Sequence, residues 1–201
     1  MANTLDVSQI TDYLCISYWP KGEHADEIQS LGVRLILSMA WRRPSRSLGN
    51  APVRLMWLPT IDSPITPIPI PTFRRGVEAA LPVIEGGDSV LVHCHAGVHR
   101  SVAMACCLLI GRGYSADDAM QLVKTKRAVA DPDRWYIRRR IRKFETYWLE
   151  ERVLRETPAQ DDQGSDMDRG ALIVAGISIG GVYLLINRDL PVWCNSTHRP
   201  T

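Results

Sequence analysis

The feature that most constrains this fold is a short apolar run that ends at a cysteine and is followed closely by a long apolar helix. Residues 89–93 are Ser-Val-Leu-Val-His, which predicts a strand buried on both faces. Residues 101–112 predict an apolar helix that ends near Gly113. A buried strand that passes directly into a buried helix is typical of α/β proteins, whose ligand sites lie where the strands end.

Alternating strands and helices predict the rest of the domain. The other predicted strands lie within residues 10–17, 33–39 and 53–58, and the other predicted helices lie over 23–31, over 72–85, from 115 and from 133. Five prolines between 59 and 71 predict a stiff, extended loop. This pattern predicts the α/β class, with a central, largely parallel sheet flanked by helices.

The loop between the two apolar elements has the spacing Cys-x-x-Gly-x-x-Arg, formed by Cys94, Gly97 and Arg100. Gly97 allows the backbone to curl so that its N–H groups point inward, at the positive end of the following helix. Such a cradle with a guanidinium beside it favours a thiolate, so Cys94 is expected to attack phosphorus. Arg100 can hold two phosphate oxygens through its planar fork, and Ser101 can donate a hydrogen bond to the sulfur.

The run from His93 to Ser101, His-Cys-x5-Arg-Ser, resembles the active-site loop of the protein tyrosine phosphatase superfamily. The short chain is similar to the dual-specificity branch, and the resemblance covers Ile10 to Trp148. It implies a dual specificity phosphatase-like fold. It also implies a cysteine-dependent phosphatase that hydrolyses phosphotyrosine, and with it phosphoserine and phosphothreonine, through a phospho-cysteine intermediate. No cofactor is expected.

The resemblance also implies roles for the loop residues. The residues expected to bind phosphate are His95, Ala96, Gly97, Val98, His99 and Arg100. His93 is expected to orient the loop, as its family counterpart does, and residues 127–133 resemble a stretch that supports this loop. Three histidines alternate around the cysteine, but zinc needs ligands that converge on one point, so no metal site is expected.

A leaving alkoxide or phenolate needs a proton, so a general acid is expected near Cys94. In the resembled family this acid is an aspartate on a loop upstream of the cysteine, and Asp62 occupies such a place. Asp88 is closer in sequence but begins the strand, so it lies at the opposite end of the sheet. Asp131 and Asp133 stay open as alternatives, because an Asp-Pro pair downstream of the cysteine supplies the acid in low-molecular-weight phosphatases.

The chain changes character after its last predicted helix. Residues 1–155 are predicted to form the phosphatase catalytic domain, 156–169 an acidic linker, 170–187 a candidate membrane anchor and 188–201 a short tail. Residues 170–187 carry no charge and, as a C-terminal transmembrane helix, would span about 27 Å. Packing of this segment on the domain is the alternative. Because a catalytic thiol needs a reducing compartment, the catalytic domain is predicted to be cytoplasmic and anchored at its C-terminal side.

The charge and the cysteine content of the chain limit the kinds of protein it can be. The net charge of +2 does not predict a nucleic acid partner, and five unevenly spaced cysteines do not predict a disulfide framework. With the resemblance, the expected partner is a phosphorylated protein, and residues 170–187 are expected to contact a membrane. Two alternatives stay open: a phosphatase for a non-protein substrate, such as a phosphoinositide or an RNA 5′ phosphate, and a catalytically silent phosphate-binding module.

Overall fold

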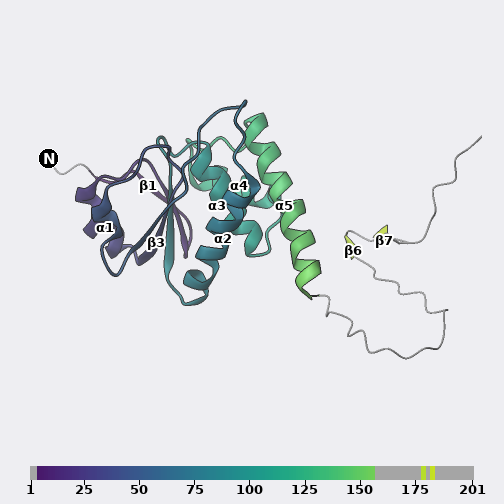
Figure 1. The fold of residues 1–201 in the computed structure, drawn as a ribbon, viewed down its shortest axis with the longest axis horizontal. Helices are drawn as coiled ribbons and strands as arrows, with labels where there is room; N and C mark the ends of the chain where they lie inside the picture. Colours follow the sequence, from purple (N-terminus) through teal and green to yellow (C-terminus); the bar gives the residue numbers. More distant parts are fainter. Residues whose placement is uncertain (1–3, 157–177, 180–181, 184–201) are drawn as a thin grey trace, which may run out of the picture. The chain divides into compact units, whose positions relative to one another are not determined.

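The structure is a computed structural model that describes residues 4–156, 178–179 and 182–183 (Figure 1). The chain divides into two units, Met1–Pro158 and Ala159–Thr201. In the first unit, five strands form one sheet in the order β1-β2-β5-β3-β4. Their bounds are Val7–Thr11 (β1), Leu14–Ser17 (β2), Val33–Ser38 (β3), Arg54–Trp57 (β4) and Ser89–His93 (β5). Only β1 is antiparallel to its neighbour, so the prediction of a largely parallel sheet is confirmed.

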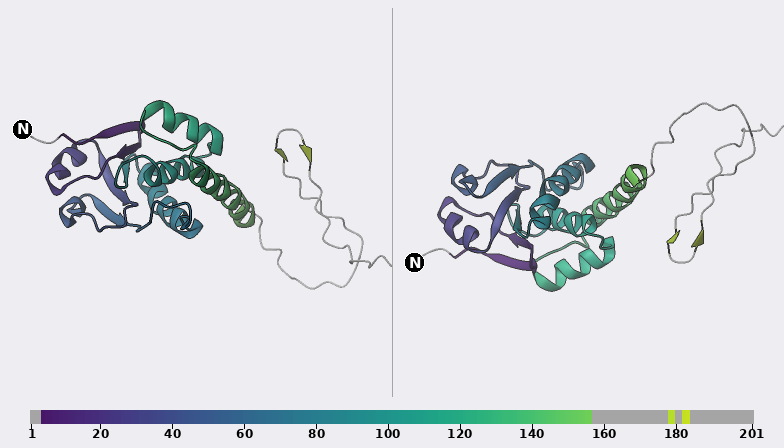
Figure 2. Two further views of the ribbon diagram at one scale, coloured as in Figure 1. Left: turned by 90° about the horizontal axis from the view of Figure 1, so that it is seen from above. Right: turned by 90° about the horizontal axis from the view of Figure 1, so that it is seen from below.

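Helices cover both faces of this sheet (Figures 1 and 2). One face carries α2 (Ile70–Glu85), α3 (Arg100–Gly111), α4 (Ala116–Lys126) and α5 (Trp135–Glu156). The other carries α1 (Ala25–Ser30) and two 3-10 turns, Gly22–His24 and Arg46–Gly49. Since successive strand residues point to opposite faces, Val90 and Val92 of β5 join the core under α2–α5, whereas Leu91 joins the core under α1.

Helix α3 is buried along nearly its whole length. Every residue from Arg100 to Ile110 is buried, because the helix packs on β5 and also on α2, α4 and α5. Its first turn follows the loop that begins at Cys94. Packing on all sides therefore fixes the end of the helix that faces this cysteine.

Two predicted elements differ from the structure. The strand predicted within residues 10–17, at Leu14–Ile16, is β2, but a turn precedes it, and the antiparallel strand β1 before that turn was not predicted. Helix α2 begins at Ile70 and not at Thr72, with Pro71 in its first turn. Proline is tolerated there because the N–H groups of a first helical turn have no intrahelical acceptor.

The predicted membrane anchor at 170–187 lies mostly outside the described residues. Within it the structure describes β6 (Ser178–Ile179) paired antiparallel with β7 (Val182–Tyr183). These four residues are in strands and not in the predicted helix. No helix in the described ranges is long and apolar enough to cross a membrane. The predicted linker beyond Glu156 and the predicted tail also lie outside the described residues, so anchoring stays a prediction.

The aromatic stripe of α5 generates a stability prediction. Phe144 is fully buried, with its ring centroid 6.0 Å from that of Phe73 and 5.5 Å from that of Trp148. F144A should lower the free energy of unfolding by about 3–5 kcal/mol, because it removes a buried ring and leaves a cavity. Urea unfolding followed by circular dichroism measures this loss. The matched control is L154A in the same helix, where the side chain is 75% exposed and the change should stay within about 0.5 kcal/mol.

Candidate active site

The loop from Cys94 to His99 joins the end of β5 to the first turn of α3. At its centre, Gly97 has a φ of +67° and lies against two neighbours. A Cβ atom there would be 2.5 Å from Nη2 of Arg127 and 2.9 Å from the carbonyl oxygen of Ser17. Only glycine therefore fits this position without strain, and the loop can curl back towards its own sulfur.

Arg127 follows α4 and supports the loop from outside. Its guanidinium is buried, and Nε donates a hydrogen bond of 2.9 Å to the carbonyl oxygen of Gly97. Nη1 donates to Oδ1 of Asp6 at 3.1 Å, which ties the loop to the segment before β1. The N–H of Asp131 donates to the carbonyl oxygen of Val98 at 3.0 Å. The segment expected to support the loop thus contacts it at two carbonyl groups.

Cys94 is buried, and its sulfur lies within hydrogen-bond reach of two groups. Oγ of Ser101 is 3.3 Å from Sγ, and the N–H of Gly97 donates to Sγ at 3.2 Å. Burial acts to raise the pKa of the Cys94 thiol, but hydrogen bonds from Ser101, the charge of Arg100 and the N–H of Gly97 together lower this pKa below that of an ordinary thiol. The surroundings of Cys94 therefore favour the thiolate.

Arg100 is 7% exposed, and one edge of its guanidinium is already anchored. Nη1 donates to the carbonyl oxygens of Thr60 at 2.9 Å and Met39 at 3.3 Å, beyond the ends of β4 and β3. Nε is buried and has no hydrogen-bond partner in the part of the chain that the structure describes. Oδ2 of Asp62 lies 3.7 Å from it. The guanidinium is thus held in place while one N–H stays available to an anion.

Asp62 lies beside the same loop, and both of its carboxylate oxygens have partners. The hydroxyl of Tyr136 donates to Oδ1 at 2.6 Å, and Nδ1 of His99 is 3.0 Å from Oδ2. Burial and the hydrogen bond to Asp62 raise the pKa of Tyr136 to about 12, so this hydroxyl remains a donor at neutral pH. Asp131, an alternative acid, contacts the far side of the imidazole instead, with Oδ2 at 3.7 Å from Nε2 of His99.

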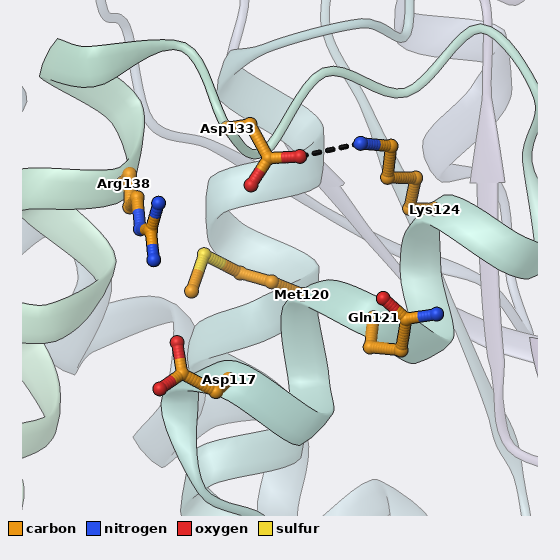
Figure 3. A pocket seen from close by; sticks show the side chains of 6 residues that line it. All are labelled: Asp117, Met120, Gln121, Lys124, Asp133 and Arg138. Atoms are coloured by element: carbon orange, nitrogen blue, oxygen red, sulfur yellow. Dashed lines mark hydrogen bonds and ion pairs between the residues drawn. The ribbon is translucent and has the colours of Figure 1, made fainter.

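The two remaining alternative acids lie away from the loop. Asp88 pairs with Arg34 at 3.8 Å, beside the first residue of β5. Asp133 pairs with Lys124 at 2.5 Å in a separate hollow of about 180 Å³ between α4 and α5 (Figure 3). This hollow is lined by Asp117, Met120, Gln121, Lys124, Asp133 and Arg138. None of these residues belongs to the loop, so the hollow contributes nothing to its chemistry.

The histidines around Cys94 have different surroundings. His93 is buried, with Nδ1 3.1 Å from the carbonyl oxygen of Cys94. Burial lowers the pKa of His93 to about 4, so the ring is neutral at neutral pH and braces the loop without adding charge. His95 is exposed, and its ring lies 6.1 Å from that of Tyr18 and 6.3 Å from that of Trp19.

A cleft of about 370 Å³ opens next to Arg100. The described residues that line it are mainly aromatic and basic, and none of them carries a carboxylate. They are Trp19, Ala40, Trp41, Arg42, His95 and Arg100. Trp41 is 63% exposed, so an indole ring stands at the mouth of the cleft. A flat or negatively charged group next to a bound phosphate would find matching surfaces here.

Sequence patterns did not predict Tyr136, Trp19 or Trp41 at this site. Tyr136 lies 74 residues from Asp62 in the chain, and no spacing rule links a tyrosine at the start of a helix to an aspartate on a distant loop. The two tryptophans could have been predicted from their positions in the chain. Each follows the carboxyl end of a strand, and ligand sites of α/β sheets lie at these ends.

Comparison with known proteins places these features in a family. Residues 14–146 match the family described as dual specificity phosphatase, catalytic domain. Human dual specificity protein phosphatase 22 is 29% identical over 117 residues, which cover 54% of this chain and 62% of that protein. Mouse dual specificity phosphatase 28 is 32% identical over 104 residues, 51% of this chain and 61% of that protein. The chain spans about half the length of the curated relatives it matches.

Solved structures share the fold. Human DUSP28 superimposes with a TM-score of 0.65 at 21% identity, covering 73% of this chain and 97% of that one. PTPMT1, solved in complex with PI(5)P, gives a TM-score of 0.65 at 19% identity, covering 73% of this chain and 98% of that one. At these identities the likeness concerns the fold alone. Since the matched family spans more than half of the 201 residues and includes the whole loop, the chain belongs to the dual specificity phosphatase family.

Proposed function

We propose that this chain hydrolyses phosphomonoesters on proteins, phosphotyrosine and with it phosphoserine and phosphothreonine, through a phospho-cysteine intermediate on Cys94. The observation that carries the proposal is a buried sulfur whose pKa is lowered by Ser101, Arg100 and Gly97. A buried anion is costly to a fold, so donors that converge on this sulfur support a chemical role for it. The free N–H of Arg100 beside it suits a phosphate oxygen.

In the first step, the phosphate binds the backbone N–H groups of residues 95–100 and the free edge of Arg100. The thiolate attacks phosphorus in line, so that an S–P bond forms as the P–O bond to the leaving group breaks. Asp62 supplies a proton to the departing oxygen. Its Oδ2 lies 3.7 Å from Nε of Arg100, which supports a place beside the bound phosphate.

In the second step, water attacks the phospho-cysteine and the S–P bond breaks. Asp62, now a carboxylate, takes the proton of the attacking water. Ser101 eases departure of the sulfur, because its hydroxyl, 3.3 Å away, donates a hydrogen bond to the thiolate as it forms again. Inorganic phosphate then leaves, and the free enzyme is restored.

The side chains that line the cleft beside Arg100 indicate which kind of substrate would fit there. The indole rings of Trp19 and Trp41 suit the aromatic ring of phosphotyrosine, and Arg42 and His95 suit acidic residues that flank it. None of the described residues that line the cleft carries a carboxylate, so a phosphoinositide or an RNA 5′ phosphate remains a second candidate. One neighbour in fold, PTPMT1, was solved with PI(5)P bound.

A substrate panel tests the proposed function. The purified full chain should release phosphate from phosphotyrosine peptides with a kcat/KM at least about tenfold above that for a phosphoinositide or an RNA with a 5′ phosphate. C94S provides the background rate. Preference for the lipid or the RNA would favour the second candidate, and no release from any compound would contradict phosphatase activity.

The lowered pKa of Cys94 predicts its pH-dependent reactivity. Because this pKa is lowered, iodoacetamide should alkylate Cys94 faster than an ordinary thiol at the same pH. S101A removes a hydrogen bond worth about 1.5–3 kcal/mol to an anion, so the rate at pH 6 should fall about tenfold or more. Mass spectrometry of the labelled peptide measures the rate, and orthovanadate should protect the thiol. Equal rates at pH 6 in both proteins would refute this account of the thiolate.

Asp62 generates a prediction about leaving groups. D62N should lower kcat about 100-fold for phenyl phosphate, whose leaving group needs a proton, and should change KM less than about threefold. Steady-state kinetics measure both constants. The matched control is D88N, which alters a carboxylate at the other end of β5 and should leave both constants unchanged. Undiminished turnover by D62N would exclude Asp62 as the acid.

A further inference from the structure

His99 occupies an unusual place, because its imidazole lies between two carboxylates. On one side Nδ1 is 3.0 Å from Oδ2 of Asp62, and on the other Nε2 is 3.7 Å from Oδ2 of Asp131. The ring is 21% exposed and the Asp62 side chain 29%, so the contact is only partly shared with water. His99 directly precedes Arg100 in the chain. The imidazole therefore belongs to the same loop as the guanidinium that faces the phosphate.

Independent contacts hold both carboxylates. Oδ1 of Asp62 accepts a hydrogen bond from Tyr136, whose ring also packs edge-on against His99 with centroids 6.0 Å apart. Asp131 is fixed by its backbone N–H, which donates to the carbonyl oxygen of Val98, and by Oδ1, which accepts the N–H of Arg134 at 3.1 Å. The imidazole is thus aligned from both sides.

The two carboxylates give an imidazolium at this place an acceptor for each of its N–H groups. An isolated aspartic acid has a pKa of about 3.9, so only about one molecule in a thousand keeps its proton at pH 7. An isolated imidazole has a pKa of about 6.5 and keeps its proton far more often at that pH. At 3.0 Å, Nδ1 of His99 and Oδ2 of Asp62 are within the distance at which a proton can pass between them. The imidazole is therefore placed to supply Asp62 with a proton.

Substrate binding would shift this proton towards Asp62. In the free protein, Nε of Arg100 lies 3.7 Å from Oδ2 of Asp62. A phosphate dianion would engage that guanidinium and add negative charge beside the carboxylate. Nδ1 of His99 lies 3.0 Å from Oδ2 of Asp62, so it is placed to pass a proton to that oxygen, whereas the Tyr136 hydroxyl contacts Oδ1.

We propose that His99 shares with Asp62 the proton that is delivered to the leaving group, and that Asp131 and Tyr136 are positioning residues for this pair. As the P–O bond breaks, the proton moves from Asp62 to the leaving oxygen, which leaves Asp62 as a carboxylate and His99 as a neutral imidazole. When water attacks the phospho-cysteine, its proton returns to the pair. The pairing depends on the proposed role of Asp62 as acid and extends it.

The test is the pH dependence of kcat/KM for the purified full chain with phenyl phosphate and with 4-nitrophenyl phosphate, whose leaving group needs little help. H99Q keeps a hydrogen-bonding side chain but cannot carry the proton. The alkaline limb of its profile is the pH range in which kcat/KM falls as the pH rises. With phenyl phosphate, this limb should move about one pH unit lower in H99Q, and kcat/KM at pH 7 should fall about tenfold. With 4-nitrophenyl phosphate the loss should stay below about threefold. The groups that face His99 are Asp62, Asp131 and Tyr136, with Arg100 beyond Asp62.

Two further variants separate proton sharing from structure. D131N keeps an acceptor for the N–H of Arg134 but removes the charge beside Nε2, so the alkaline limb should move in the same direction by a smaller amount. H95Q changes another histidine of the same loop, which contacts Tyr18 and Trp19, and should leave the position of the limb unchanged whatever its effect on kcat. Thermal unfolding of each variant monitors the fold, and D131N tests the same pair should H99Q fail to fold.

The outcomes distinguish this inference from the proposed function. A uniform loss in H99Q with both substrates and an unmoved limb would overturn proton sharing and leave only a structural role. If D62N abolishes the alkaline limb while H99Q and D131N retain it, Asp62 is the acid and works alone. If D62N itself behaves as wild type with phenyl phosphate, the assignment of the acid fails, and the inference fails with it. Inactivity of the wild-type chain towards both compounds would instead contradict the phosphatase proposal.

Discussion

A sulfur anion can be kept inside a protein only where hydrogen-bond donors and positive charge converge on it, because burial alone favours the neutral thiol. At Cys94 these donors come from Gly97, Ser101 and Arg100, all within the junction of β5 and α3. Gly97 can approach the sulfur because it has no Cβ, and the space that a side chain would need is occupied by Arg127. The anion site thus depends on a backbone turn that a buried arginine holds from behind.

The fold supplies what that turn requires. Strand β5 lies between β2 and β3, so its carboxyl end is held on both sides. Helix α3 is buried along its length, which fixes the helix end that faces the cysteine. Arg127 reaches back to Asp6, so even the segment before β1 contributes to the position of the loop. The core and the anion site are therefore stabilised by the same packing.

The acid side of the site is assembled from distant parts of the chain. Asp62 follows β4, Tyr136 begins α5, and Asp131 lies in the segment that supports the loop. They meet at His99, whose neighbour in sequence is Arg100. Because adjacent residues of one loop face the acid and the phosphate position, a change in charge at either place is felt at the other.

Local chemistry explains which features were predictable. The spacing of Cys94, Gly97 and Arg100 between a buried strand and a buried helix predicts a thiolate and an anion cradle, since each residue type has a separate physical use there. Apolar residues spaced 4, 3 and 4 positions apart in α5 predict one buried face, and the structure buries all of them: Ile137, Ile141, Phe144 and Trp148. The start of α2 at Ile70 was missed, because a proline in the first turn looks like a helix breaker when the boundary is unknown.

The α/β class and the identity of the loop could be predicted from the residues alone, because periodicity and residue chemistry are local properties. Strand β1 could not be predicted in this way, because its pairing with β2 depends on a turn. Packing in three dimensions was needed to show that Asp62 contacts both Tyr136 and His99 and that Asp131 faces the other side of that imidazole. The same holds for the pair of Asp133 and Lys124 in a separate hollow. These contacts join residues far apart in sequence. Their distances depend on how loops after different strands and helices pack together, and no spacing along the chain records that packing.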